Sequence, residues 1–390
     1  MLELDCGLAF DLAHADDLFS ALPPRPAVCL IELKDEGAEP LLIRTQDLRR
    51  RLQRLLGPPD PASKRLNLRG VAGGVRYRLT GSRFEQIFTY YLRARELFPQ
   101  RYQSMLRLRP PAVLKVSLRN AYPRCYVTRR IAVDDSGVPT GGAYYGPFAS
   151  RRSAEAFASS ALDFFKVRRC QIKIRRDPAF PGCMYSEMKM CLAPCFAGCS
   201  KEEYDVEVQK LVQFLDSSGG SLRDALEQER ETASEQMDFE RAASAHKRIE
   251  KLDDALRGSP ELPRRIEELD AVILQRSAEE QSIAIYAVRR GWLAEPAFIR
   301  FAEIAGLPRS AEHIFREYLE GAGANAEARA ASGAPLGKTV LNEHLWLVAR
   351  WFYSNPREGE IFFRGKDWPY RRIMRGCSRL LAPRESPAAE

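Results

Sequence analysis

The sequence predicts an α+β protein of several domains. With 390 residues the chain has room for about two to four domains. Segments typical of strands alternate with segments of helical spacing in the first half, and a long charged helical region follows. Between them lies a loop rich in proline and glycine, from Arg168 to Cys199, that holds five of the nine cysteines. These observations predict separate units arranged around a cysteine-rich segment.

The composition is that of a folded, basic protein. Hydrophobic residues make up 45% and charged residues 29%, which excludes a disordered chain. The net charge of +8 favours a polyanionic partner. The N-terminus lacks the basic start and apolar run of a signal peptide, and no apolar stretch is long enough to span a bilayer. We therefore expect a cytoplasmic protein without membrane association, in which free thiols and metal–thiolate sites persist.

The first half is expected to mix short strands with helices. Apolar runs bounded by glycine or proline predict strands, and apolar residues at helical spacing predict helices. The expected strands lie at the end of 22–33, at Glu39–Ile43, as a pair within Asn67–Thr80 around Gly73 and Gly74, and as two within Ala112–Val133. The expected helices are Gln46–Leu56, Ser82–Leu97 and Ser150–Phe165, while residues 1–20 show no clear pattern.

The cysteine-rich segment is the strongest candidate for a metal site. Cys170, Cys183, Cys191 and Cys195 follow a C-x12-C-x7-C-x3-C spacing, and Cys199 repeats the last interval. Thiolates are soft anionic ligands, and four of them can hold a metal ion or an iron–sulfur cluster. Buried, unreactive thiols are the alternative. Disulfides are less favoured, because no secretory segment is visible.

The segment Glu202–Leu256 is predicted to be helical. Ser217–Gly220 breaks it, and Asp238 fits the N-cap of a last helix that carries an apolar stripe from Phe239 to Leu252. A helix pair of this size cannot bury its stripe alone. Either a partner's helix pair or the rest of this chain covers it, and both alternatives stay open.

The C-terminal part is expected to be a small α+β region. Its predicted strands are Leu269–Ile273, Ser282–Val288 and Pro296–Phe301, and its predicted helices are Ser310–Leu319 and Leu341–Tyr353. The Ala/Gly-rich stretch Ala322–Gly337 is expected to be mobile. The tail Arg357–Arg379 interleaves arginines with aromatic residues, which suits nucleic-acid contact, although core packing is the favoured interpretation.

Five motifs in order resemble the UvrC family of nucleotide-excision-repair nucleases. They are YYGPF with its following helix, the cysteine block ending in CLAPC, the helix SKEEYDVEVQKLVQFLDSSGG, the stretch ASEQMDFERAASAHKRIEKL, and DAVILQRSAEEQSIAIYAVRRGWL. The fourth is similar to the UVR motif, the helical hairpin that docks onto UvrB. The fifth resembles the beginning of the family's RNase H-like half. The resemblance runs from about Leu22 to about Phe301.

The resemblance implies a division into five parts. Residues 21–105 would be a degenerate GIY-YIG-like nuclease domain, and 106–165 a linker of strands with the YGPF helix. Residues 166–200 would be the cysteine-rich segment, 201–258 the helical region with the UVR motif, and 264–390 a partial RNase H-like sheet with a basic, aromatic C-terminal region.

The nuclease motif departs from the family at its catalytic positions. Cys29 and Leu41 stand where tyrosines are expected, and Tyr90 stands where a metal-holding glutamate is expected. Leucine cannot accept a proton, and a neutral phenol is a poor ligand for Mg²⁺. Arg51 matches the arginine that neutralises the attacked phosphate. Phosphate binding is therefore expected to persist, through the basic residues Arg44, Arg49, Arg50 and Arg51.

The resemblance also implies a cofactor and partners. Cys170, Cys183, Cys191 and Cys195 would hold an iron–sulfur cluster of the 4Fe-4S type, with zinc as the alternative, and Mg²⁺ is expected only if the nuclease is active. DNA would be one partner, and UvrB the other, through the UVR residues Phe239, Glu240, Arg241, Ala242 and Ala243. Asp270 and His344 match the RNase H-like metal site by residue type only, and structural roles are favoured for both.

Three functions remain open. The first is a DNA-repair protein that binds DNA and UvrB after loss of nuclease activity. The second is an active excision endonuclease with an atypical site, which would incise DNA beside damage. The third is a nucleic-acid-binding protein outside repair.

Overall fold

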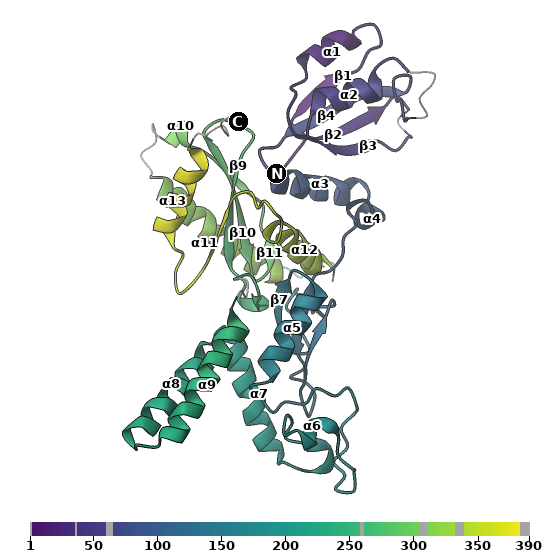
Figure 1. Ribbon diagram of the computed structural model, residues 1–390. Coiled ribbons are helices and arrows are strands. Elements are labelled where there is room, and N and C mark those ends of the chain that lie inside the picture. The colour runs from purple at the N-terminus through teal and green to yellow at the C-terminus, as the bar shows by residue number, and fades with distance from the viewer. Residues whose placement is uncertain are drawn as a thin grey trace, which may run out of the picture.

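The structure is a computed structural model that describes residues 2–35, 37–59, 65–257, 261–304, 310–331 and 339–382 (Figure 1). These residues form three antiparallel sheets with helices packed on them, which confirms the α+β prediction. No helix in these ranges combines the length and the apolar character needed to cross a membrane.

The N-terminal sheet has the strand order β1-β4-β2-β3. Its strands are β1 (Cys6–Ala9), β2 (Ala27–Leu33), β3 (Leu41–Thr45) and β4 (Ala72–Leu79), and helices α1 (Ala15–Ala21) and α2 (Leu48–Leu56) pack on one face. The prediction of a strand pair around Gly73 and Gly74 is wrong. Both glycines lie in the single strand β4, because it pairs with β2 on one side and β1 on the other.

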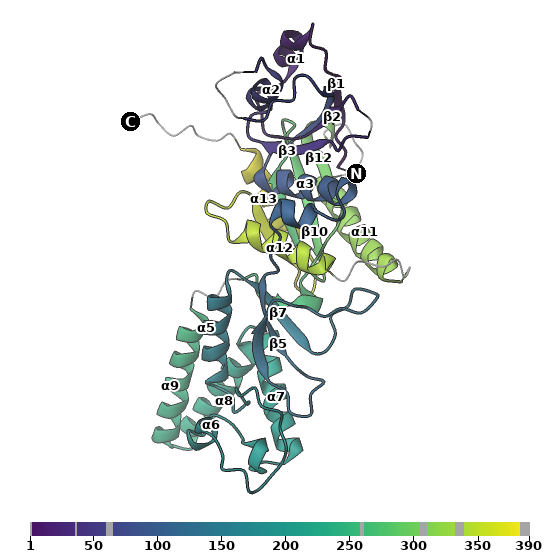
Figure 2. The same cartoon turned by 90° about the vertical axis from the view of Figure 1, so that its right-hand side faces the viewer.

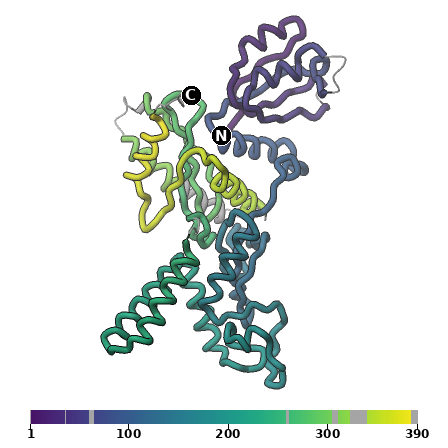
Figure 3. Tube along the Cα trace, viewed as in Figure 1, coloured from purple at the N-terminus to yellow at the C-terminus, as the bar shows by residue number. Residues whose placement is uncertain are grey.

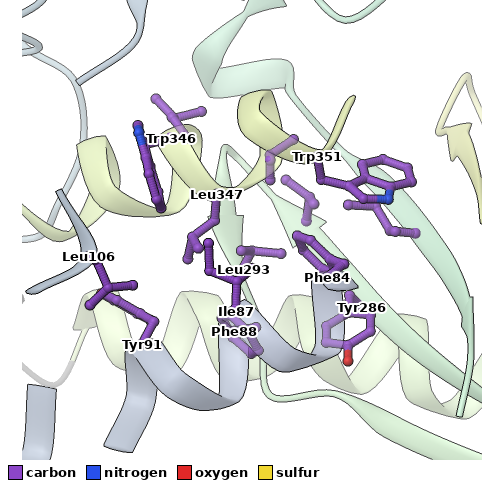
Figure 4. Close-up of a cluster of buried hydrophobic side chains, with 14 of the residues drawn as sticks. Phe84, Ile87, Phe88, Tyr91, Leu106, Tyr286, Leu293, Trp346, Leu347 and Trp351 are labelled. Carbon is purple, nitrogen blue, oxygen red and sulfur yellow. The ribbon is translucent and has the colours of Figure 1, made fainter. Parts of the chain in front are cut away.

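Helix α3 (Arg83–Leu97) joins this sheet to the C-terminal half of the chain. It begins at Ser82, whose side chain accepts a hydrogen bond from the Glu85 amide, as expected for an N-cap. Its apolar face packs against Tyr286 and Trp351, which come from far along the chain (Figure 4). The short helix α4 (Tyr102–Leu106) follows it.

The middle sheet has the order β6-β5-β7-β8. Its strands are β5 (Ala112–Val116), β6 (Cys125–Thr128), β7 (Ala143–Phe148) and β8 (Arg264–Arg265). Helix α5 (Arg151–Leu162), which begins with a capping box at Ser150, and helix α7 (Lys201–Asp216) share one core with this sheet (Figure 2). The strand β8 returns to the sheet after the helical hairpin and so ties the hairpin's base to it.

Between α5 and α7 the cysteine segment is mostly loop, as predicted. It contains only the short helix α6 (Met184–Glu187) and the 3-10 turn η1 (Pro194–Phe196). Helices α8 (Gly220–Glu235) and α9 (Phe239–Leu256) then form an antiparallel hairpin that projects away from the sheets (Figure 3). Asp238 caps α9 by accepting from the Arg241 amide, which confirms the predicted helix start.

The third sheet lies between helices that come from both ends of the chain. It consists of β9 (Ala271–Arg276), β10 (Ser282–Arg289), β11 (Trp292–Leu293), β12 (Ala297–Arg300) and β13 (Glu360–Phe363), with the 3-10 turn η2 (Ile266–Glu268) before β9 and the short helix α10 (Phe301–Ile304) after β12. Its strand order is β11-β10-β9-β13, and β12 pairs with β10. Helices α11 (Ala311–Ala331) and α13 (Tyr370–Leu381) pack in one core, and α12 (Val340–Phe352) packs in the other with α3.

Three predictions for the chain ends can be compared with this arrangement. The first twenty residues are not patternless, because they contribute β1 and α1 to the N-terminal sheet. Helix α11 extends through Ala331, into the stretch expected to be mobile, and the remainder of that stretch lies outside the described residues. In the basic tail Phe362 and Trp368 are buried, which confirms the core interpretation for these two.

Candidate functional site

A cavity of about 210 Å³ lies in the N-terminal domain where the catalytic positions of the nuclease motif were expected. It is lined by residues of β3, α2, α3 and α4, namely Leu42, Ile43, Arg44, Arg51, Ile87, Tyr90, Met105 and Leu106. The sequence predicted Arg44, Arg51 and Tyr90 as site residues. It did not predict Met105 and Leu106, which carry no motif and reach the cavity through the turn after α3.

Arg44 and Tyr90 contact each other in the lining of this cavity. The guanidinium carbon of Arg44 lies 5.9 Å from the centre of the Tyr90 ring, within the range of a cation–π interaction. Burial lowers the pKa of Arg44, and the positive charge of Arg350 from α12 lowers it further. Burial raises the pKa of Tyr90, although Arg44 opposes that rise. The phenol is therefore neutral, and the cavity is cationic at neutral pH.

Cys29 and Leu41 do not reach this cavity. Strand side chains alternate between faces, and both residues pack on the opposite side of the sheet, against α1 and α2. Cys29 is completely buried, and burial raises its pKa to about 12. A thiol so placed is neither a nucleophile nor a ligand. The structure thus separates these two positions from Arg44, Arg51 and Tyr90.

The other two predicted arginines have different roles. Arg49 donates hydrogen bonds to the backbone carbonyls of Ser20 and Leu22, so it braces the loop before β2. Arg50 is exposed on α2. Of the four predicted arginines, only Arg44 and Arg51 therefore line the cavity.

The described lining of the cavity includes no carboxylate. Helix α3 carries two glutamates, Glu85 and Glu96. Glu85 is buried and accepts a hydrogen bond from the Gly81 amide, and Glu96 forms an ion pair with Arg93 on the helix surface. Neither lines the cavity, so the described residues supply it with no hard ligand for Mg²⁺.

The four cysteines of the predicted metal site lie near one another, on the loops between α5 and α7. The pKa of Cys191 is raised to about 11, chiefly by burial, and the nearby thiols of Cys170, Cys195 and Cys183 add to this rise. In the part of the chain that the structure describes, no three histidine, cysteine or acidic side chains are grouped closely enough to hold a single metal ion. In an iron–sulfur cluster the cysteines bind different irons. The cluster therefore needs four thiols that lie near one another, but it does not need them to converge on a single point. The donor set fits such a group.

Asp270 and His344 have structural partners. The carboxylate of Asp270 pairs with Arg289 at 2.9 Å and with Arg364 at 3.3 Å. The Nδ1 atom of His344 accepts a hydrogen bond of 3.0 Å from the Leu293 amide within the core. These contacts give both residues roles in holding the third sheet.

The UVR-like residues lie at the exposed tip of the α8–α9 hairpin. Phe239 is 73% exposed and Met237 is 76% exposed. Glu240, Arg241 and Ala243 are also exposed, and Ala242 is half-buried. Nearer the base, Ile249 and Leu252 are buried in the core of the middle sheet. The two alternatives for the apolar stripe therefore apply to different parts of it: this chain covers the base and leaves the tip uncovered.

Comparison with known proteins adds to this geometry. Residues 112–214, which span β5 to most of α7, match the family described as UvrC/Cho excinuclease, middle domain. The middle part of this multidomain chain is therefore similar to an excinuclease middle domain. No solved structure matches the chain.

The relatives found by sequence agree with that match. The chain is 26% identical over 279 residues to the UvrABC system protein C of Dehalococcoides mccartyi, which covers 70% of this chain and 44% of the relative. It is 30% identical over 205 residues to that of Nitratidesulfovibrio vulgaris, which covers 51% of this chain and 27% of the relative. The chain is thus similar to these proteins over up to 70% of its length, and it spans less than half the length of these curated relatives.

Proposed function

We propose that this chain is a DNA-binding protein of nucleotide excision repair that works with UvrB and whose N-terminal domain no longer cuts DNA. The single observation that carries the proposal is the cavity beside α3, which has two guanidinium groups and, among its described lining residues, no carboxylate.

The chemistry of the cavity favours phosphate binding over hydrolysis. Hydrolysis of a phosphodiester needs an activated water and a divalent cation that bears the developing charge. Leu41 lies outside the cavity, and Tyr90 is a neutral phenol next to a cation. No carboxylate among the described residues lines the cavity with Arg44 and Arg51, so their charges are available to a phosphate.

The hairpin tip supports the proposed contact with UvrB. Relatives of this chain carry the name UvrABC system protein C, and a large aromatic side chain that is 73% exposed marks a typical anchor of a protein interface. Phe239 would insert into the partner, with Glu240, Arg241, Ala242 and Ala243 around it.

The cysteine segment would serve as a structural element. Cys170, Cys183, Cys191 and Cys195 would hold a 4Fe-4S cluster, and the bound group would fix loops that contain little regular structure. Zinc, the alternative, would require these thiols to close around one point, which the described side chains do not do. Mg²⁺ would be needed only by an active nuclease. Redox chemistry is not part of the proposal.

An incision assay tests the proposal. Purified chain is mixed with UvrA, UvrB, Mg²⁺ and a duplex that carries a lesion, and the expected result is binding without incision. Arg44→Ala/Arg51→Ala should weaken DNA binding about tenfold. The matched double variant Arg151→Ala/Arg152→Ala, at the exposed start of α5, should not. Incision that disappears in Arg51→Ala would overturn the proposal.

A further inference from the structure

The most one-sided charge of the molecule lies between the cavity and the edge of the middle sheet. Residues 101–130 contain eight basic residues and no acidic one: Arg101, Arg107, Arg109, Lys115, Arg119, Arg124, Arg129 and Arg130. Arg101 pairs with Glu39. The other seven have no carboxylate partner among the described residues.

This basic run begins at the cavity. Met105 and Leu106 of α4 line it, and the chain then passes Arg107 and Arg109 before it enters β5. Both arginines are exposed. The descent from α4 to the middle sheet is visible in Figure 1. Exposed cations therefore continue from the cavity of Arg44 and Arg51 to the sheet.

On the sheet the cations lie beside aromatic rings. Lys115 is opposite Tyr126 of β6 and Tyr144 of β7, so the three side chains share one face. Its ammonium group lies 4.9 Å from the centre of the Tyr144 ring, and the guanidinium carbon of Arg124 lies 4.4 Å from the centre of the Tyr126 ring. The opposite face, with Leu114 and Val116, packs in the core with α5. On the Lys115 face Tyr144 is completely buried in the core that contains α3 and α12, so Tyr126 is the ring of this face that a ligand can reach.

The strand β6 leaves room for a ligand. It is the edge strand of the middle sheet, Tyr126 is half-buried, and Tyr126 belongs to none of the hydrophobic cores. Arg129 and Arg130 are exposed just after it, and Arg119 is exposed in the turn before it. The nearest acidic residue in the sequence is Asp134. Its carboxylate accepts hydrogen bonds from Ser136 and from the Val138 amide within its own turn.

We infer that the β5–β6 face is a binding track for single-stranded DNA. Cations at this density attract a phosphate backbone, and a base can stack on the Tyr126 ring beside the Arg124 guanidinium. Duplex DNA is the less suitable occupant, because its bases are already stacked and cannot use the ring. The choice of DNA as the ligand rests on the proposed function. The inference adds that the middle domain binds the unpaired strand.

Fluorescence anisotropy with the full chain and a labelled oligothymidine tests the stacking. Tyr126→Ala should weaken binding about tenfold. Tyr126→Phe keeps the aromatic face and should bind like the wild type. Neither variant should change binding to a duplex of equal length by more than about twofold. Circular dichroism checks that each variant is folded. A folded Tyr126→Ala variant with wild-type affinity for oligothymidine would overturn the inference, as would a Tyr126→Phe variant as weak as Tyr126→Ala.

The salt dependence tests the phosphate contacts. Each contact to a single strand contributes about 0.7 to the slope of log affinity against log salt, so Arg129→Ala/Arg130→Ala should lower the slope by about 1.4. The control Arg151→Ala/Arg152→Ala, on α5, removes the same charge and should leave the slope unchanged. Equal slopes in the two double variants would contradict the track.

These assays contain no UvrB and no Mg²⁺, so they separate the two proposals. If Arg44→Ala/Arg51→Ala were the only variant to lose oligothymidine binding, the track would be refuted and the proposed phosphate binding in the cavity would stand. A wild-type chain that binds no DNA would refute both proposals.

Discussion

The hydroxyl group of Tyr91 donates a hydrogen bond of 2.7 Å to the carboxylate of Glu343, which lies 252 residues later in the chain. The same carboxylate accepts hydrogen bonds from Tyr102 and from Gln103, both at 2.8 Å. Glu343 is buried on α12, and its three donors come from α3 and α4. This network joins the cavity-bearing N-terminal part to the third sheet.

Removal of this carboxylate should destabilise the protein. Glu343→Ala leaves the donors of Tyr91 and Tyr102 buried without an acceptor, and we expect a loss of about 3 kcal/mol in the free energy of unfolding. Glu343→Gln keeps one acceptor oxygen and should lose about half as much. Urea unfolding followed by circular dichroism measures both. A loss in Glu343→Ala below about 0.5 kcal/mol, as for a surface substitution, would contradict this role.

Glu85 should make the stability depend on pH. Burial raises its pKa from 4.5 to about 7, against the opposing effects of the Gly81 amide and Arg78. The folded state therefore holds the proton more tightly, and its contribution to stability is complete below pH 4.5 and is lost as the pH rises to about 7. Glu85→Gln stays neutral and can still accept from the Gly81 amide. It should be more stable than the wild type by up to about 3 kcal/mol at pH 8, but not at pH 4.

Denaturation at the two pH values measures this difference. Glu96→Gln, on the exposed side of the same helix, serves as the control and should stay within about 0.5 kcal/mol of the wild type at both. An identical pH dependence in the wild type and in Glu85→Gln would show that Glu85 titrates normally.

The base and tip of the α8–α9 hairpin should respond differently to truncation. Ile249→Ala removes a side chain that is 7% exposed, and we expect a loss of about 3 kcal/mol. Phe239→Ala should change stability by less than about 0.5 kcal/mol, since the ring has few neighbours to lose. It should nevertheless weaken binding to immobilised UvrB about tenfold. Equal UvrB binding by Phe239→Ala and the wild type would remove the tip from the proposed interface.

The cysteine block should carry metal. Anaerobically purified protein should be brown, with absorbance near roughly 400 nm from iron–sulfur charge transfer. Cys191→Ser should lose the colour, and Cys6→Ser, an exposed thiol outside the block, should keep it. Colourless protein with one zinc per chain would select the alternative metal. Protein with neither iron nor zinc would show that the thiols are unliganded.

Local signals in the sequence were sufficient for most helices and for their order. Ser82, Ser150 and Asp238 each accept a hydrogen bond from an amide three residues later, and such contacts need no distant partner. Helices α1, α4 and α13 were not predicted, and α11 extends beyond its predicted end, because its alanine-rich second half carries little apolar pattern. The motifs also identified the family, since they depend on residue types and spacing alone.

The strands and the cavity depended on the tertiary structure. β1 has no recognisable pattern of its own, and it exists as a strand because it pairs with β4 some 65 residues later. The sequence pointed to Arg44, Arg51 and Tyr90, but it could not tell that Cys29 and Leu41 face away, because that depends on which side of the sheet each helix covers.

What the sequence by itself determined is therefore the set of elements, their caps and the chemical groups that they carry. What only the tertiary structure decided is which of those groups meet: α3 buries its aromatic face against α12, Glu343 finds its donors on α3 and α4, and Arg101 pairs with Glu39. The physical reason is range. Helix caps and helical spacing depend on residues a few positions apart, whereas burial and charge pairing depend on neighbours that can lie hundreds of residues away in the sequence.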